Sequence, residues 1–237
     1  MEHPIDPRAE FSEWLHAELV HDFAGERQAW ALDRVARVQE RLNQWRPGRE
    51  PLDTTILDID PPLAFTLVGR HVYFSRRLLE RMPTDDAVAF VLAHEAAHHD
   101  LGHFDLFTGW GKLVPRMEST KYVAVLAALC EHHAYGPERE NDADAYAVAL
   151  SMKAGYNGAL AVQALAILEM LALDLGDVSA VFGPENLLDP TDPKAASTAY
   201  GVQRWVWTHL HGYHPLHERV ARVRRLVKAE KERGAVA

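Results

Sequence analysis

The stretch FVLAHEAAHHDLGHF, residues 90–104, places four histidines and one glutamate among apolar and small residues. His94, Glu95 and His98 fit the pattern H-E-x-x-H. On an α-helix, positions i and i+4 lie on one face, one turn apart, so both imidazoles can reach a single zinc ion at about 2.0–2.1 Å. Glu95 lies about 100° round the helix from His94, where its carboxylate can contact a zinc-bound water without binding the metal itself. The pattern therefore predicts a catalytic zinc site.

The alternative is that these histidines are the polar flank of an ordinary helix. A five-residue pattern with two free positions also arises by chance, and the chain has 14 histidines. However, the preceding residues 87–93, AVAFVLA, are apolar enough to bury the helix. A buried pair of histidines beside a glutamate would, without a metal, leave polar groups that are costly to satisfy. The flanking sequence therefore favours metal binding.

A catalytic zinc site needs a third protein ligand and leaves the fourth position to water. The pattern H-E-x-x-H-x-x-G-x-x-H is excluded, because the sequence has Leu101 where glycine is needed and Phe104 where histidine is needed. If the helix continued, His103 would lie about 140° round it from His98. We therefore expect His99 and His103 to be supporting or surface residues rather than ligands.

An acidic run later in the chain offers a carboxylate ligand. The residues PERENDADAYAV, 137–148, place four acidic side chains at the start of a predicted helix: Glu138, Glu140, Asp142 and Asp144. The helix macrodipole alone favours acidic residues there, but four exceed what capping requires. Glu140 and Asp144 are four residues apart and share a face. One of them can bind zinc while the other holds the free ring nitrogen of a ligand histidine.

The composition is that of a globular protein with a real core: 237 residues, of which 48% are hydrophobic and 25% charged. A net charge of −9 and a pI near 5.8 argue against nucleic-acid binding. Cys130 is the single cysteine, so no internal disulfide can form and a reducing compartment is favoured. No signal-peptide pattern is visible, and the apolar runs are too short or too charged to span a membrane. We therefore expect a cytoplasmic protein.

Periodicity and turn signals predict an α+β, mostly helical fold. Three short β-type runs, TTILDI at 54–59, AFTLV at 64–68 and HVYFS at 71–75, predict a small sheet. Ser75 is expected to cap a short helix, and Pro83 to Asp86 to begin the helix that ends near Gly102. The expected helices cover 8–46, 76–82, 87–101, 117–134, 138–155, 159–175, 194–210 and from about 216. A long irregular loop is expected at 176–193.

With these features the chain resembles the M48 family of metallopeptidases over roughly residues 54–226. The matching segments are a hairpin and helix leading to the motif, AFTLVGRHVYFSRRLLERMPTDDAVAFVLAHEAAH, then ENDAD, then AYAVALSMKAGYNGAL. The resemblance implies a zincin-like (gluzincin) domain, with a small sheet and hairpin beside the H-E-x-x-H helix. It also implies one Zn²⁺ per chain, held by His94, His98 and Glu140, with Asp144 behind the ligands. Members often carry a histidine five residues after the second ligand, as His103 does.

The family also has a His-Pro motif before its final helix and an arginine soon after it. His214, followed by Pro215, and Arg219 are the matching candidates, with the arginine one position earlier than in the family pattern. The resemblance implies that they lie near the site and assist substrate or transition-state binding. His209 and His211 are alternatives for the role of His214.

These inferences lead to a zinc endopeptidase in which Glu95 activates the attacking water. We expect a helical segment at 1–50 packed on an M48-like domain at 51–237. The expected partner is a protein or peptide, bound in extended form along the hairpin edge between Phe65 and Tyr73; no nucleic acid or membrane span is expected, and the oligomeric state is open. The alternatives are a zinc-containing binding or scaffold protein that cleaves nothing, and a latent peptidase gated by the loop at 176–193.

Overall fold

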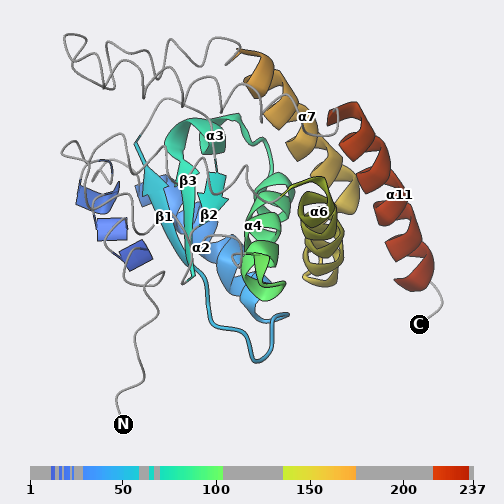
Figure 1. The fold of residues 1–237 in the computed structure, drawn as a ribbon, viewed down its shortest axis with the longest axis horizontal. Helices are drawn as coiled ribbons and strands as arrows, with labels where there is room; N and C mark the ends of the chain where they lie inside the picture. The colour runs from blue at the N-terminus through green and yellow to red at the C-terminus, as the bar shows by residue number, and fades with distance from the viewer. Residues whose placement is uncertain are drawn as a thin grey trace.

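The structure is a computed structural model of the 237-residue chain. It describes residues 12–13, 16–17, 19–21, 23, 29–58, 64–66, 70–103, 136–174 and 216–234. The fold is mostly helical with one small sheet, as the sequence predicted. Figure 1 shows the order across the molecule: the sheet, then the helix α4, then α6, with α7 and α11 beyond them.

The sheet consists of β1 (Asp53–Leu57), β2 (Ala64–Thr66) and β3 (His71–Ser75), in the order β1-β3-β2. The three predicted β-runs are confirmed where the structure describes them; residues 59, 67 and 68 of these runs lie outside the described residues. β2 and β3 form an antiparallel pair, and β1 runs parallel to β3. Because β3 pairs on both sides, the described sheet has its edges at β1 and β2. Tyr73 lies on the central strand, whose two edges are both paired. Of the hairpin expected to bind a peptide between Phe65 and Tyr73, only β2 therefore has an edge without a partner among the described strands.

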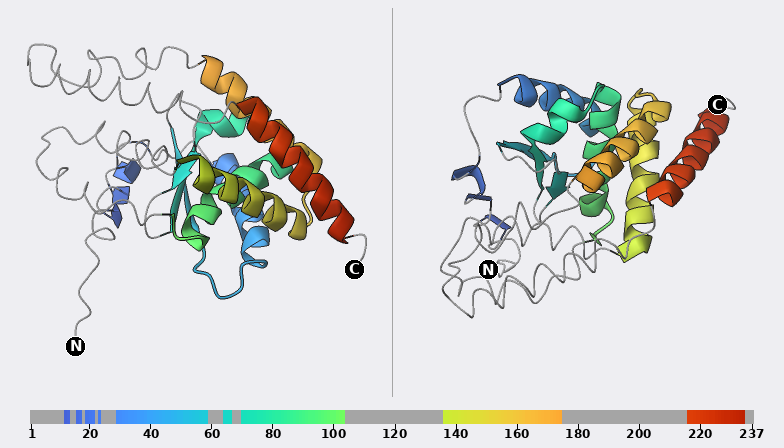
Figure 2. Two further views of the ribbon diagram at one scale, coloured as in Figure 1. Left: turned by 45° about the vertical axis from the view of Figure 1, so that its right-hand side comes forward. Right: turned by 90° about the horizontal axis from the view of Figure 1, so that it is seen from above.

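Side chains of β3 alternate between two different environments. Val72 and Phe74 join the main core together with Ile56 of β1 and the apolar residues of α4. His71 and Tyr73 point to the other face, because successive residues of a strand alternate. Tyr73 is fully buried there and stacks on Phe65 of β2, with ring centroids 4.7 Å apart. The described residues between 12 and 23, here called the N-terminal segment, lie on this second face (Figure 2).

Side-chain caps begin the two helices that follow the sheet. Ser75 caps α3 (Arg76–Arg81), where its hydroxyl accepts a hydrogen bond from the Leu78 amide at 3.0 Å. Thr84 caps α4 (Asp85–Asp100) in the same way, accepting from the Ala87 amide at 3.3 Å. Gly102 follows α4 with a φ of 71°, a conformation that glycine adopts without strain. These starts and the predicted stop near Gly102 are confirmed.

The remaining described helices are α2 (Ala29–Asn43), α6 (Gly136–Lys153), α7 (Gly158–Asp174) and α11 (Leu216–Gly234). α4 packs against α2, α6 and α7, and α11 packs against α6 and α7. The helices predicted at 138–155, 159–175 and from 216 are confirmed, and α2 falls within the pattern predicted at 8–46. The helices predicted at 117–134 and 194–210, the loop at 176–193, Cys130 and His214 lie outside the described residues. None of the helices in the described ranges is both long and apolar enough to cross a bilayer.

The boundary expected at residue 50 stays a prediction. α2, which precedes it, contributes Ala31, Val35, Val38 and Leu42 to the same core cluster as α4. These residues lie three or four positions apart, so they form one apolar face of the helix. α2 is thus packed on the rest of the described structure through its apolar face.

A buried ion pair joins the end of α4 to the turn after α2. The Arg46 guanidinium donates hydrogen bonds from Nε and Nη2 to the two Asp100 oxygens, each at 2.7 Å, and the two side chains are 2% and 3% exposed. The Tyr146 hydroxyl of α6 also donates to Asp100. Burial opposes ionisation of Asp100, but hydrogen bonds from Arg46 and Tyr146 outweigh it and lower its pKa. The helices α4 and α6 and the turn after α2 therefore meet at one carboxylate.

The substitution Asp100→Asn is expected to destabilise the protein by about 3–5 kcal/mol, because it leaves the buried Arg46 charge without a counterion. The free energy of unfolding, measured by denaturant titration, checks this. Glu50→Gln is the matched control, since Glu50 pairs with Arg70 at an exposed position, and we expect a change within about 0.5 kcal/mol. Equal effects of the two substitutions would contradict the importance assigned to the buried pair.

Candidate metal centre

Three side chains from two helices converge where α4 packs against α6. His94 and His98 lie one turn apart on α4, and Glu140 lies in the first turns of α6. The Nε2 atoms of the two histidines are 3.3 Å apart. Glu140 places Oε2 3.3 Å from His94 Nε2 and Oε1 3.6 Å from His98 Nε2. The structure thus brings together the three residues that were predicted as ligands.

Their spacing fits a tetrahedral metal ion. Ligand atoms that lie about 2.0–2.1 Å from a zinc ion in tetrahedral geometry are about 3.4 Å from one another. The distance between the two histidine nitrogens and the distance from each of them to a Glu140 oxygen are close to this value, although the two histidines approach different oxygens of Glu140. All three side chains are buried, and Glu140 Oε1 has no hydrogen-bond partner among the described residues. An unpaired buried carboxylate oxygen is costly, and a cation at this point would satisfy it. The donor set therefore fits zinc.

The electrostatics of the cluster also favour a positive charge at its centre. Burial alone would lower the pKa of His94, but Glu140 and Asp144 outweigh it and raise that pKa to about 10. Burial opposes ionisation of Glu140 as well, yet His94 and Arg219 hold its pKa well below the ordinary value. The carboxylates thus hold a proton on His94. A divalent cation would take the place of that proton, because a ligand imidazole must be neutral.

Asp144 lies behind His94, one turn after Glu140 on α6. Its Oδ1 is 3.2 Å from His94 Nδ1, an ion-pair distance without hydrogen-bond geometry. The charge of Asp144 still favours the ring orientation that leaves Nε2 facing the metal position. Arg219 of α11 donates to both Asp144 oxygens, at 3.0 and 2.7 Å, and Arg222 Nη2 lies 3.4 Å from Oδ2. Burial would raise the pKa of Asp144, but Arg219 and His94 outweigh it and lower the pKa to about 2. Asp144 therefore stays ionised.

Arg219 contacts both carboxylates of the centre. Besides its two bonds to Asp144, its Nη2 lies 3.4 Å from Glu140 Oε2. The structure thus places Arg219 beside the predicted ligand set. Arg222, one turn further along α11, was not singled out from the sequence. Arg222 belongs to a run of basic residues, and the sequence does not indicate which residues of that run face the site.

His103 approaches the site from beyond the end of α4. Its Nδ1 is 2.9 Å from His98 Nδ1, and its side chain is buried. His103 would lie about 140° round the helix from His98 only if α4 continued, but α4 ends at Asp100 and the positive φ of Gly102 turns the chain back. Burial, helped by the charge of Arg139, lowers the pKa of His103. A neutral His103 can accept a hydrogen bond from His98 Nδ1, which places the lone pair of His98 on Nε2, the atom that faces His94 and Glu140.

His99 points away from the centre, toward the sheet. Its Nε2 contacts the hydroxyl of Thr66 in β2, and the same hydroxyl donates to the His71 carbonyl oxygen at 2.8 Å. Burial lowers the pKa of His99 to about 4. The neutral ring therefore links the motif helix to the strand β2, the supporting position that was expected for it.

Glu95 is buried beside His94, and its Oε2 has no hydrogen-bond partner among the described residues. Burial raises its pKa to about 7, with the nearby Glu140 charge acting in the same direction, against His94 and Arg219. The carboxyl group thus lies next to the predicted ligands, and its Oε2 atom can form a hydrogen bond with a bound molecule. His214, the other residue predicted to take part in the chemistry, lies outside the described residues.

A small sheet beside a helix carrying H-E-x-x-H, with a carboxylate supplied by a later helix, is the arrangement of a metallopeptidase. The comparison with known families agrees. The model of Peptidase family M48 matches residues 27–227, and the chain belongs to this family. The resemblance inferred from the sequence is thereby confirmed. None of the curated proteins compared with the chain matches it.

Replacing Asp144 by alanine is expected to weaken zinc binding by about 10- to 100-fold, because His94 loses the partner that orients it. The affinity can be measured by competition with a chromophoric chelator, with circular dichroism to verify folding. Asp142→Ala is the matched control, since Asp142 is exposed on the same helix. An unchanged affinity in a folded Asp144→Ala protein would contradict this role.

Proposed function

We propose that the protein is a zinc-dependent endopeptidase. The convergence of His94, His98 and Glu140 at 3.3–3.6 Å is the observation that carries this proposal. Membership of Peptidase family M48 supports the reaction class. When bound, zinc supplies a Lewis acid that polarises the scissile carbonyl and makes water more acidic.

Glu95 is the proposed general base. Its buried carboxylate takes a proton from the attacking water and passes it to the leaving amine. It suits this task because it is next to a ligand in sequence and has an oxygen without a hydrogen-bond partner in the described structure. His214 is proposed to assist the developing oxyanion, with His209 and His211 as alternatives. Arg219 and Asp144 are proposed as positioning residues, since the contacts described above hold them to each other and to the ligands.

The substrate is proposed to bind in extended form along β2. β3 uses both of its edges within the sheet, whereas one edge of β2 has no partner among the described strands. β2 also packs against α4. Thr66 of β2 contacts His99, the residue that follows the proposed ligand His98, so β2 lies near this ligand. A peptide added to this edge would run beside the metal centre, which is how extended peptides commonly bind to sheets.

Glu95→Gln is expected to reduce hydrolysis of casein or a peptide library by about 10²- to 10⁴-fold, because the amide cannot accept the water proton. Zinc content per chain, measured by elemental mass spectrometry, should be unchanged. Glu138→Gln is the matched control, since Glu138 is exposed on α6, and it should leave both measurements unaltered.

Full activity in Glu95→Gln would refute the mechanism. A wild-type protein that binds zinc stoichiometrically but cleaves nothing would instead favour the binding or scaffold alternative. Activity that arises only after deletion of residues 176–193 would identify the latent form. Comparing cleaved N-termini between cells with wild-type protein and cells with Glu95→Gln would then reveal the substrates.

A further inference from the structure

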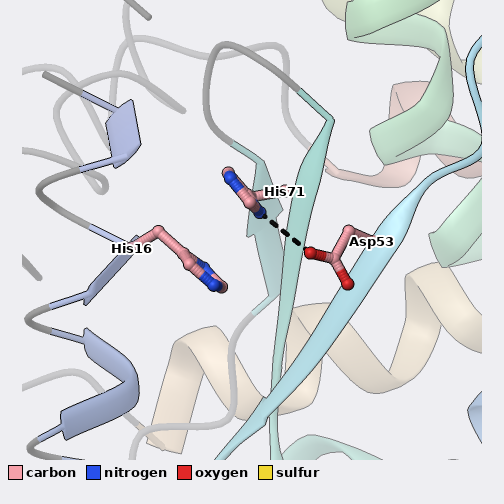
Figure 3. A group of neighbouring side chains, drawn as sticks. All are labelled: His16, Asp53 and His71. Carbon is pink, nitrogen blue, oxygen red and sulfur yellow. Dashed lines mark ion pairs between the residues drawn. The ribbon is translucent and has the colours of Figure 1, made fainter. Parts of the chain in front are cut away.

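A second cluster of potential metal ligands lies on the face of the sheet that does not join the main core. It consists of His16, Asp53 and His71, whose ligand atoms all lie within 4.8 Å of one another. Asp53 begins β1 and His71 begins β3, and the two are register partners in the parallel pair. Figure 3 shows His71 directed toward Asp53, with His16 reaching the same place from the N-terminal segment.

The surroundings of His71 are unusual because each ring nitrogen faces a carboxylate. Nε2 lies 3.0 Å from Glu13 Oε1, within hydrogen-bond distance, and the pKa of Glu13 is lowered mainly by this bond. Nδ1 lies 3.3 Å from Asp53 Oδ2, and this buried nitrogen has no hydrogen-bond partner within the part of the chain that the structure describes. If Nε2 carries the proton that is donated to Glu13, the lone pair of Nδ1 faces a carboxylate oxygen. A lone pair that faces a carboxylate oxygen is repelled by it, and either a proton on Nδ1 or a metal ion between the two atoms would remove the repulsion.

His16 completes the set from a different part of the chain. The described residues between 12 and 23 are helical, so Glu13 and His16 lie on one face, three positions apart. His16 Nδ1 is 2.9 Å from the hydroxyl of the buried Tyr73, which leaves Nε2 for another partner. Burial, followed by the nearby His71, lowers the pKa of His16 and favours its neutral form. One helical turn therefore supplies both a ligand and the carboxylate that orients His71.

We propose that His16, Asp53 and His71 form a second metal site, for a divalent transition-metal ion such as zinc. Two imidazoles and one carboxylate are a donor set that suits this class of ion. Glu13 has the role that a carboxylate takes behind a metal-bound histidine, fixing the tautomer and direction of His71. The site is independent of the proposed peptidase reaction.

The geometry indicates weaker binding than at the first centre. The His16 and His71 rings are stacked, with centroids 3.9 Å apart and planes inclined by 10°. A nitrogen lone pair lies in the plane of its ring, so His16 must tilt out of the stack to share an ion with His71. Asp53 has a side chain that is 47% exposed, so water would compete for the remaining coordination positions. An ion here would fasten the N-terminal segment to the starts of β1 and β3.

The test is a zinc titration of the full chain, with bound equivalents counted by native mass spectrometry. The wild-type protein is expected to bind two equivalents, the second more weakly than the first. Asp53→Asn, which keeps the shape of the side chain, and His16→Ala should each lose the second equivalent and keep the first. His21→Ala is the matched control, because His21 is an exposed histidine of the same segment, and it should keep both.

Thermal unfolding provides a second measurement that does not depend on activity. The second equivalent should raise the Tm of the wild-type protein but not that of Asp53→Asn. Retention of the first equivalent shows that a variant is folded. Saturation of the wild type at one equivalent would overturn the proposal and assign a proton to His71 Nδ1. A second equivalent that survives both substitutions would overturn it as well, because the ion would then bind elsewhere.

Discussion

The close packing of α4 against α6 is the constraint on which the metal centre depends. Two imidazoles and a carboxylate can share one ion only if the two helices approach closely. The helical period places Ala97 of α4 three residues after His94, and Ala143 and Ala147 of α6 three and seven residues after Glu140, on the same sides of their helices. All three alanines are fully buried. Short side chains at such positions favour close helix packing, so we expect them to help position the candidate ligands.

Two arginine–aspartate pairs, one buried and one partly buried, connect this helix pair to the elements around it. Arg46 and Asp100 fix the end of α4 to the turn after α2, and Tyr146 extends the contact to α6. Arg219 fixes Asp144 of α6 to α11. Such pairs add little net stability compared with apolar packing, but they tolerate few other geometries. Their effect here is to set the position of the ligands more than to strengthen the fold.

Local sequence signals were enough to predict much of the fold. Capping by Ser75, the start of α4 and the stop near Gly102 depend on neighbouring residues, so they could be inferred without the structure. The same holds for His94 and His98, which one helix brings together. The third ligand was different, because the residues alone left Glu140 and Asp144 equivalent. Only the family resemblance distinguished them, and the structure places Glu140 at both histidines and Asp144 behind one of them.

Contacts between distant segments could not be predicted in this way. The parallel pairing of β1 with β3, the return of His103 to His98 and the position of Arg222 all depend on tertiary packing. The cluster of His16, Asp53 and His71 is the clearest case. Its members lie in three separate segments, and neither histidine belongs to a recognisable motif. The strand pairing alone brings Asp53 beside His71, and no local pattern carries that information.

The contact between Arg219 and Asp144 spans 75 residues of chain, and this separation has a consequence for protein synthesis. α4 and α6 leave the ribosome well before α11. Until α11 docks, Asp144 and Glu140 lack Arg219, and His94 is left to offset the charge of two carboxylates that repel each other. We therefore expect the candidate ligand set to reach its final geometry only after α11 has been made. A nascent chain would thus not carry a finished hydrolytic centre while the rest of it is still unfolded.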